Sequence, residues 1–66
     1  MTGVIKFYNI KKGFGFIQAD ETNSEYFFHF SSLKDRTVVE NDRVSFDIMP
    51  DPQGRKPRAI NVRKIL

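Results

Sequence analysis

The chain of 66 residues contains no cysteine and no tryptophan, and it has one histidine, His29. Without cysteine, disulfides and cysteine-based metal sites are excluded, and a reducing compartment is expected. A lone histidine cannot form a metal cluster, so we expect no metal and no other cofactor. His29 also lacks the ordered serine or cysteine partner that nucleophilic catalysis requires. The sequence therefore favours a binding protein over an enzyme.

Long apolar runs are also missing. No segment approaches the ~20 apolar residues that span a bilayer. Lysines are scattered through Met1–Phe14, where a signal peptide would have an apolar run. These absences predict a cytoplasmic protein with no membrane partner. The length predicts a single domain, residues 1–66, and a chain this short buries only ~60% of the surface that its unfolded form exposes.

The charge is modest and the aromatic content is high. Lys and Arg total 11 against 8 Asp and Glu, which gives a net charge of +3. This charge suits a polyanionic partner without demanding one. Seven Phe and two Tyr make the chain rich in aromatic residues. A small domain can rarely leave such side chains in water without a reason, so their placement decides the function.

The pattern along the chain predicts strands, because helical periodicity is absent and short strand-like runs alternate with turn residues. A flat sheet would expose two long edges that invite aggregation. Closure removes these edges, so we expect an all-β, five-stranded antiparallel barrel of the OB-fold type. The predicted strands are Gly3–Asn9, Gly13–Ala19, Glu25–Phe30, Arg43–Met49 and Arg58–Ile65. A polar turn at Asn9–Lys12, a hairpin loop at Asp20–Ser24, a helical turn at Ser31–Leu33, a charged connection at Lys34–Asp42 and a loop at Pro50–Pro57 join them.

Residues two apart in a strand share a face, and this parity gathers Phe14 and Phe16 with Phe27 and His29. Gly15 lies between the first two rings, and a glycine inside a strand marks a bend or a close backbone approach. We therefore expect the four ring-bearing residues to face outward. The opposite face begins the expected core, which comprises Ile17, Tyr26, Phe28, Val4, Leu33, Val44, Phe46, Ile60 and Val62.

An outward face of rings beside lysines is typical of single-stranded nucleic-acid binding. Unpaired bases stack on aromatic rings, worth ~1–3 kcal/mol per base, and Lys6 and Lys12 can meet phosphates. Duplex readers need a helix or ribbon for the major groove, which this chain does not offer. The plainer interpretation is that these aromatic residues are all core. Burying both faces would require a second layer, for which 66 residues are too few.

Three segments carry a resemblance to a known family. Lys12–Ile17 (KGFGFI) is similar to the first ribonucleoprotein motif, and Tyr26–Ser31 (YFFHFS) is similar to the second motif of bacterial cold-shock proteins. With Gly3–Asn9 (GVIKFYN) upstream, the chain resembles the cold-shock domain from end to end. The RNA recognition motif has a similar first motif, but its other motif lies upstream and it needs two helices.

The resemblance implies a low-specificity binder of single-stranded RNA and DNA that acts as an RNA chaperone or as a regulator of transcription or translation, with a part in the cold-shock response. A monomer is expected. Phe30 departs from simple alternation, so its exposure requires a local bend. In this family the first aromatic position usually holds Trp, where this chain has Phe7, and Lys34–Asp42 is short and carries Arg36 in place of an aromatic residue. The implied contact set is Lys6, Phe7, Lys12, Phe14, Phe16, Phe27, His29 and Phe30. Arg55, Lys56 and Arg58 in and after the last loop are candidates for extra phosphate contacts, and the alternative is that these basic side chains are only solvated.

One alternative from another class stays open. An SH3-like barrel could receive a proline-rich peptide on the same aromatic face. Acidic residues commonly flank such grooves, whereas Lys6 and Lys12 accompany this one. Binding of an oligonucleotide that weakens with added salt would distinguish the two.

Overall fold

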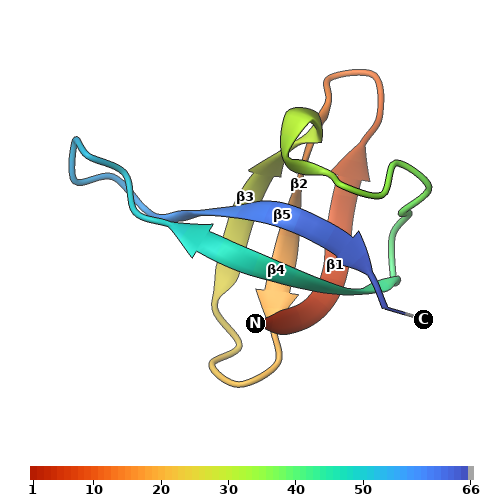
Figure 1. Ribbon diagram of the computed structural model, residues 1–66, viewed down its shortest axis with the longest axis horizontal. Coiled ribbons are helices and arrows are strands. Elements are labelled where there is room, and N and C mark those ends of the chain that lie inside the picture. Colours follow the sequence, from red (N-terminus) through yellow and green to blue (C-terminus); the bar gives the residue numbers. More distant parts are fainter. Residues whose placement is uncertain (66) are drawn as a thin grey trace.

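The computed structural model describes residues 1–65, and Leu66, the last residue of the expected domain, lies outside the described residues (Figure 1). Each predicted strand is present, with bounds that differ by one residue at most. The elements are β1 (Thr2–Asn9), β2 (Phe14–Ala19), β3 (Glu25–His29), the 3₁₀ helix η1 (Phe30–Ser32), β4 (Arg43–Met49) and β5 (Arg58–Lys64).

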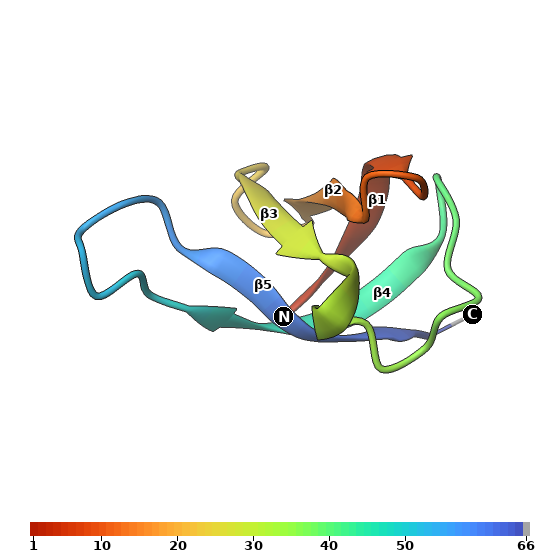
Figure 2. The ribbon, with the colours of Figure 1, turned by 90° about the horizontal axis from the view of Figure 1, so that it is seen from above.

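The strands close into a barrel in the order β1-β2-β3-β5-β4. Figure 2 shows β1, β2 and β3 as one wall, with β4 and β5 across the core from it. Pairing is antiparallel between β1 and β2, β2 and β3, β4 and β5, and β1 and β4. The closing pair, β3 with β5, is parallel and meets at Phe27 and Arg58. The expected all-β, five-stranded OB-type barrel is therefore confirmed, with a parallel pair at its closing seam.

The core lies between the two walls. Two of the expected core positions are wrong, since Val4 and Ile60 are only half-buried and lie outside the buried cluster. Val4 pairs with Gln18 on the outer face, whereas Ile5 pairs with Ile17 on the inner one. Tyr26 is partly buried against the core rather than enclosed. The buried set is Ile5, Ile17, Ala19, Phe28, Leu33, Val38, Val44, Phe46, Ala59 and Val62.

A β-bulge in β1 brings Phe7 to the outer face. Ile5 pairs with Ile17 and Phe7 pairs with Phe16, so Lys6 is an extra residue on β1. Strict alternation would place Phe7 inside with Ile5, because the two lie two residues apart. The extra residue resets the parity. Lys6 and Phe7 are consequently both exposed.

A second irregularity in β5 explains the error at Ile60. The register of β4 against β5 shifts between Ser45 and Asp47, and Asn61 has a positive φ of 53°. This left-handed residue separates Ala59 from Val62, and both of these side chains are fully buried. Asparagine tolerates this conformation better than most residues. The inward positions of β5 are thus three residues apart, which alternation cannot produce.

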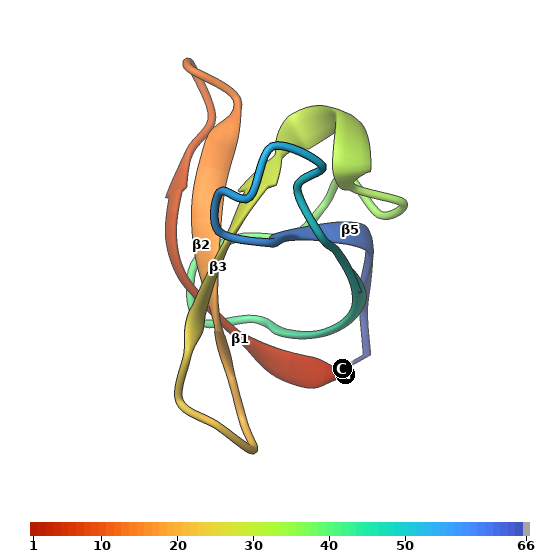
Figure 3. The same cartoon turned by 90° about the vertical axis from the view of Figure 1, so that its left-hand side faces the viewer.

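The two ends of the barrel carry different loops. The turn between β1 and β2 lies at the same end as η1, and the hairpin between β2 and β3 lies at the opposite end (Figure 3). A backbone hydrogen bond of 2.8 Å from the Phe30 N–H to the Gly13 carbonyl joins η1 to the first turn. The loop between β4 and β5 projects sideways from the barrel (Figure 1). These loops border the outer face of β1–β3.

Candidate nucleic-acid interface

Four phenylalanine rings form one outward cluster on β1, β2 and β3, called here the aromatic cluster. Phe7 and Phe27 are 40% and 39% exposed, and Phe14 and Phe16 between them are partly covered. The Phe14 and Phe27 rings stack with centroids 5.8 Å apart and an interplanar angle of 23°. Phe7 contacts both central rings, at 5.8 Å from Phe14 and 6.3 Å from Phe16. The rings therefore support one another and present a continuous apolar surface to solvent.

The glycine between the two central rings fixes this arrangement. A Cβ atom on Gly15 would lie 2.7 Å from Cζ of Phe28, which is fully buried in the core. Real Cβ atoms essentially never come so close to another heavy atom. Gly15 therefore lets Phe28 fill the core directly beneath the strand. The close approach inferred from the sequence is present, on the inner face as expected.

His29 continues the surface toward η1. His29 pairs with Phe14 across the strands, and its ring centroid lies 4.7 Å from that of Phe30. The Ser31 N–H donates to Nδ1 of His29 at 3.2 Å, and the Ser31 hydroxyl lies 2.9 Å from the same atom. In the neutral ring the proton consequently lies on Nε2, which leaves an N–H donor for a ligand. The ring is thus oriented by its own chain.

Phe30 is exposed because the strand ends before it. β3 stops at His29, and η1 begins at Phe30, which is 41% exposed. The local bend that its exposure required is therefore present. A Cβ atom on Gly13, whose φ is +73°, would lie 2.6 Å from Cδ1 of Phe30, so the ring packs closely against this glycine. The guanidinium carbon of Arg36 lies 5.4 Å from the ring centroid, within cation–π range.

Basic residues border both ends of the aromatic surface. Lys6 is exposed on β1, and Lys12 lines a hollow of about 380 Å³ beside Phe30, called here the Phe30 hollow. Arg58 pairs with Phe27 at the seam. A second hollow of about 370 Å³ lies between Phe27 and the loop before β5, and Arg55, Lys56 and Arg58 line it with Phe16, Glu25, Asp51 and Pro57.

The structure brings together the sequence-predicted residues in two groups and adds others. Phe7, Phe14, Phe16 and Phe27 form the aromatic cluster, and Lys12 and Phe30 meet at the Phe30 hollow. Sequence reasoning missed three residues that also line this hollow. An isoleucine inside an otherwise polar turn was the available signal for one of them. The three are Tyr8, Ile10 and Lys11.

The shifted carboxyl groups lie outside these two groups of residues. Hydrogen bonds from the Arg43 side chain and from the Thr2 hydroxyl lower the pKa of Asp20, and the charge of Arg43 adds to the effect. The side-chain and backbone hydrogen bonds from Thr37 lower the pKa of Asp35. Both groups are stabilised in the charged form, which suits structural acceptors. Neither carboxyl is prepared to exchange protons near neutral pH.

Two other site classes have no support among residues 1–65. This part of the chain contains no group of three or more His, Cys, Asp or Glu side chains placed to hold a metal ion. No helix within it is long and apolar enough to cross a membrane.

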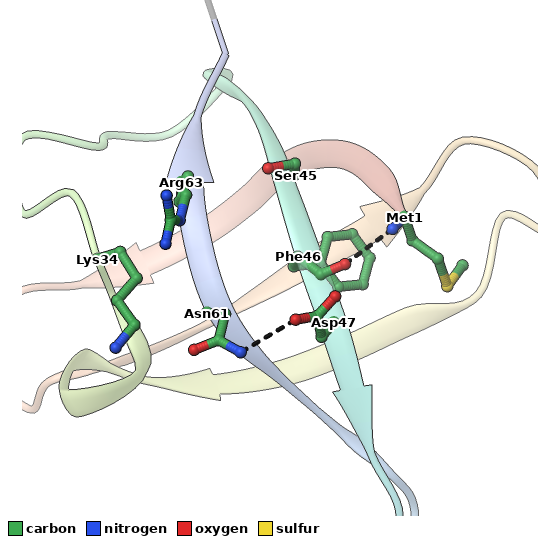
Figure 4. A pocket seen from close by; sticks show the side chains of 7 residues that line it. All are labelled: Met1, Lys34, Ser45, Phe46, Asp47, Asn61 and Arg63. Carbon is green, nitrogen blue, oxygen red and sulfur yellow. Dashed lines mark hydrogen bonds between the residues drawn. The ribbon is translucent and has the colours of Figure 1, made fainter.

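A further hollow of about 460 Å³ lies on β4 and β5, and none of the aromatic cluster lines it (Figure 4). Some of the polar groups that line this hollow already have hydrogen-bond partners in the chain. Asn61 Nδ2 donates to an Asp47 carboxylate oxygen at 3.0 Å, and the Met1 ammonium donates to the Phe46 carbonyl at 2.8 Å. The cations of Lys34 and Arg63 share the hollow with the Asp47 carboxylate. This mixed lining marks no single class of ligand.

The closed strand order and the aromatic outer wall define an OB-type barrel with a candidate nucleic-acid face. Comparison with known proteins agrees: the family described as the 'Cold-shock' DNA-binding domain matches residues 1–65. The cold shock-like protein CspG of Escherichia coli (strain K12) is 42% identical, and the cold shock-like proteins CspJ of Salmonella typhimurium (strain LT2) and CspI of Escherichia coli (strain K12) are each 40% identical. Each alignment covers 94% of this chain and 90% of the relative. The chain belongs to the cold-shock domain family.

Proposed function

We propose that this protein binds single-stranded RNA and DNA with low sequence specificity. The observation that supports this proposal most directly is the outward cluster of Phe7, Phe14, Phe16 and Phe27 on adjacent strands. Every base has a π-face, so such a surface stacks unpaired bases without selecting their identity. In this proposal the protein has no catalytic activity and acts as a cytoplasmic monomer of one domain.

The proposed contact residues divide by chemistry. The rings of the aromatic cluster and Phe30 stack bases, and His29 offers its Nε2–H to a base or a phosphate. Lys6, Lys12 and Arg58 are exposed, Lys12 lines the Phe30 hollow and Arg58 lines the hollow beside Phe27, and in this proposal all three contact the phosphates. Binding to phosphates releases condensed counterions, which makes the affinity depend on salt.

We extend the proposal to RNA metabolism. A protein that stabilises unpaired strands lowers the free energy of the open form of a folded RNA. It thereby acts as an RNA chaperone or as a regulator of transcription or translation, including during the response to cold. The hollow beside Phe16 and Phe27 is lined by three basic side chains, Arg55, Lys56 and Arg58, and by two acidic ones, Glu25 and Asp51. This positive balance favours nucleic acid over a proline-rich peptide.

Titration of the full chain with matched hexamers of U and of dT tests this function. Tyrosine fluorescence or NMR shifts follow binding at about 50 and about 300 mM salt. We expect saturable binding of both hexamers that weakens at the higher salt, and weak binding of a blunt duplex of the same length. A proline-rich peptide serves as the control ligand. Absence of binding at both salt concentrations, or preference for the peptide, would refute the proposal.

A further inference from the structure

Ile10 is an exposed aliphatic side chain at the tip of the turn between β1 and β2. It is 71% exposed, which is the largest value among the exposed large apolar residues of the described chain; Val39 follows with 51%. A single exposed apolar residue is common and needs no explanation by itself. Ile10 differs from Val39 because Ile10 lines the Phe30 hollow, whereas Val39 does not.

The turn that carries Ile10 is held by its own hydrogen bonds. The Gly13 N–H donates to the Asn9 carbonyl at 2.8 Å, and the Lys12 N–H donates to the Asn9 Oδ1 atom at 3.0 Å. Gly13 supplies the positive φ of 73° that the turn requires. The turn projects past the ends of its strands beside η1 (Figures 1 and 3). The isoleucine is therefore presented at a fixed position.

Ile10 borders the Phe30 hollow, which combines apolar and cationic side chains. Tyr8 and Phe30 supply rings, Lys11 and Lys12 supply cations from the turn, and Arg36 supplies one from the connection before β4. No Asp or Glu lines this hollow. An apolar tip above a positively charged hollow matches a ligand with flat apolar faces and a polyanionic backbone.

We propose that Ile10 covers the terminal base pair at the junction between a double-stranded stem and a single strand. The idea rests on the proposed function, because the unpaired strand would continue from Phe30 onto the aromatic cluster. An aliphatic side chain has no π-face with which to stack a lone base. Aliphatic and aromatic residues inserted between base steps are instead what proteins use to part stacked pairs. Lys11 and Arg36 meet the phosphates of the two strands as they separate.

A stem-loop RNA with a single-stranded tail, labelled with a fluorophore and a quencher at the base of the stem, tests this inference. The full chain is compared with Ile10→Ala, Ile10→Leu and the control Val39→Ala. We expect Ile10→Ala to slow stem opening about fourfold or more, because the substitution removes three carbon atoms and the burial of one CH₂ group alone accounts for about fourfold. Ile10→Leu and Val39→Ala retain wild-type opening, and Val39→Ala binds the tail alone with unchanged affinity. Ile10→Ala slows opening by a larger factor than it weakens binding of the tail.

The outcomes separate this inference from the proposed function. If wild-type protein binds the tail but Ile10→Ala opens the stem as fast as wild type, the inference is overturned and the proposed function stands. If Ile10→Ala weakens binding of the tail and stem opening by the same factor, Ile10 belongs to the single-strand surface and the inference is again overturned. If wild-type protein does not bind the tail, both fall.

Discussion

Phe27 and Phe28 are neighbours in β3 with opposite environments. Phe27 is 39% exposed in the aromatic cluster, while Phe28 is fully buried in the core beneath Gly15. The two residues have the same side chain and lie in the same strand, so each is a control for the other when they are mutated. Any difference between their variants reports on the face each ring occupies.

We predict that Phe27→Ala weakens binding of a U hexamer by ~1–3 kcal/mol, because one stacking ring is lost. Its barrel remains folded. Phe28→Ala is expected to lose ~3–5 kcal/mol of unfolding free energy through the cavity left in the core. Urea denaturation and hexamer titration measure the two effects. Equal destabilisation by both variants would show that Phe27 is structural.

At this scale the sequence predicts which rings share a face, because strand parity is a local property. Phe14, Phe16 and Phe27 share a face through alternation alone. Phe7 came only from the family resemblance, since alternation from Ile5 places it inside. Ile10 was missed because the turn around it is otherwise polar, and its neighbours in space come from η1 and from the connection before β4.

The strands themselves were predicted within one residue, whereas their irregularities were not. The bulge at Lys6 and the left-handed Asn61 each reset the parity of a strand, so Val4 and Ile60 were assigned to the core in error. A bulge depends on how two strands twist against each other across the barrel. One strand's sequence does not contain that information. The residue pattern therefore predicts the bounds of a strand more reliably than it predicts which face each side chain occupies.

Asn61 provides a test of this irregularity. We predict that Asn61→Ala is less stable than Asn61→Gly by about 1–2 kcal/mol, because a left-handed residue with a Cβ atom is strained. Both variants lose the hydrogen bond to Asp47, so their difference isolates the backbone conformation. Denaturant unfolding measures it. An alanine variant as stable as the glycine variant would argue against the positive φ.

An exposed ion pair links three strands of the barrel at one end of β2. Asp20, which follows β2, accepts from Arg43 of β4 at 2.6 Å and from the Thr2 hydroxyl of β1 at 2.7 Å. The pKa of Asp20 is lowered in the folded state, so its contribution to stability is present above the ordinary value of 3.8. That contribution is lost as the pH falls through the lowered pKa.

We predict that Arg43→Gln reduces this dependence on acid. Because the largest cause of the lowered pKa is removed, the variant gains less stability from Asp20 at neutral pH and loses less as the pH falls below 3.8. Thermal unfolding at a series of pH values measures both effects. Arg63→Gln is the control, since Arg63 forms no salt bridge among the described residues. Identical pH profiles for wild type and Arg43→Gln would contradict the prediction.

The parallel seam between β3 and β5 affects where the barrel opens locally. In the described chain its register consists of one pair, Phe27 with Arg58, extended by the bridge between Leu33 and Val62. So short a contact opens more readily than the long antiparallel ladders, and amide hydrogens along it are expected to exchange with solvent sooner. A nucleotide that stacks on Phe27 and places its phosphate on Arg58 would hold β3 and β5 together. Ligand binding would therefore slow amide hydrogen exchange at this seam first.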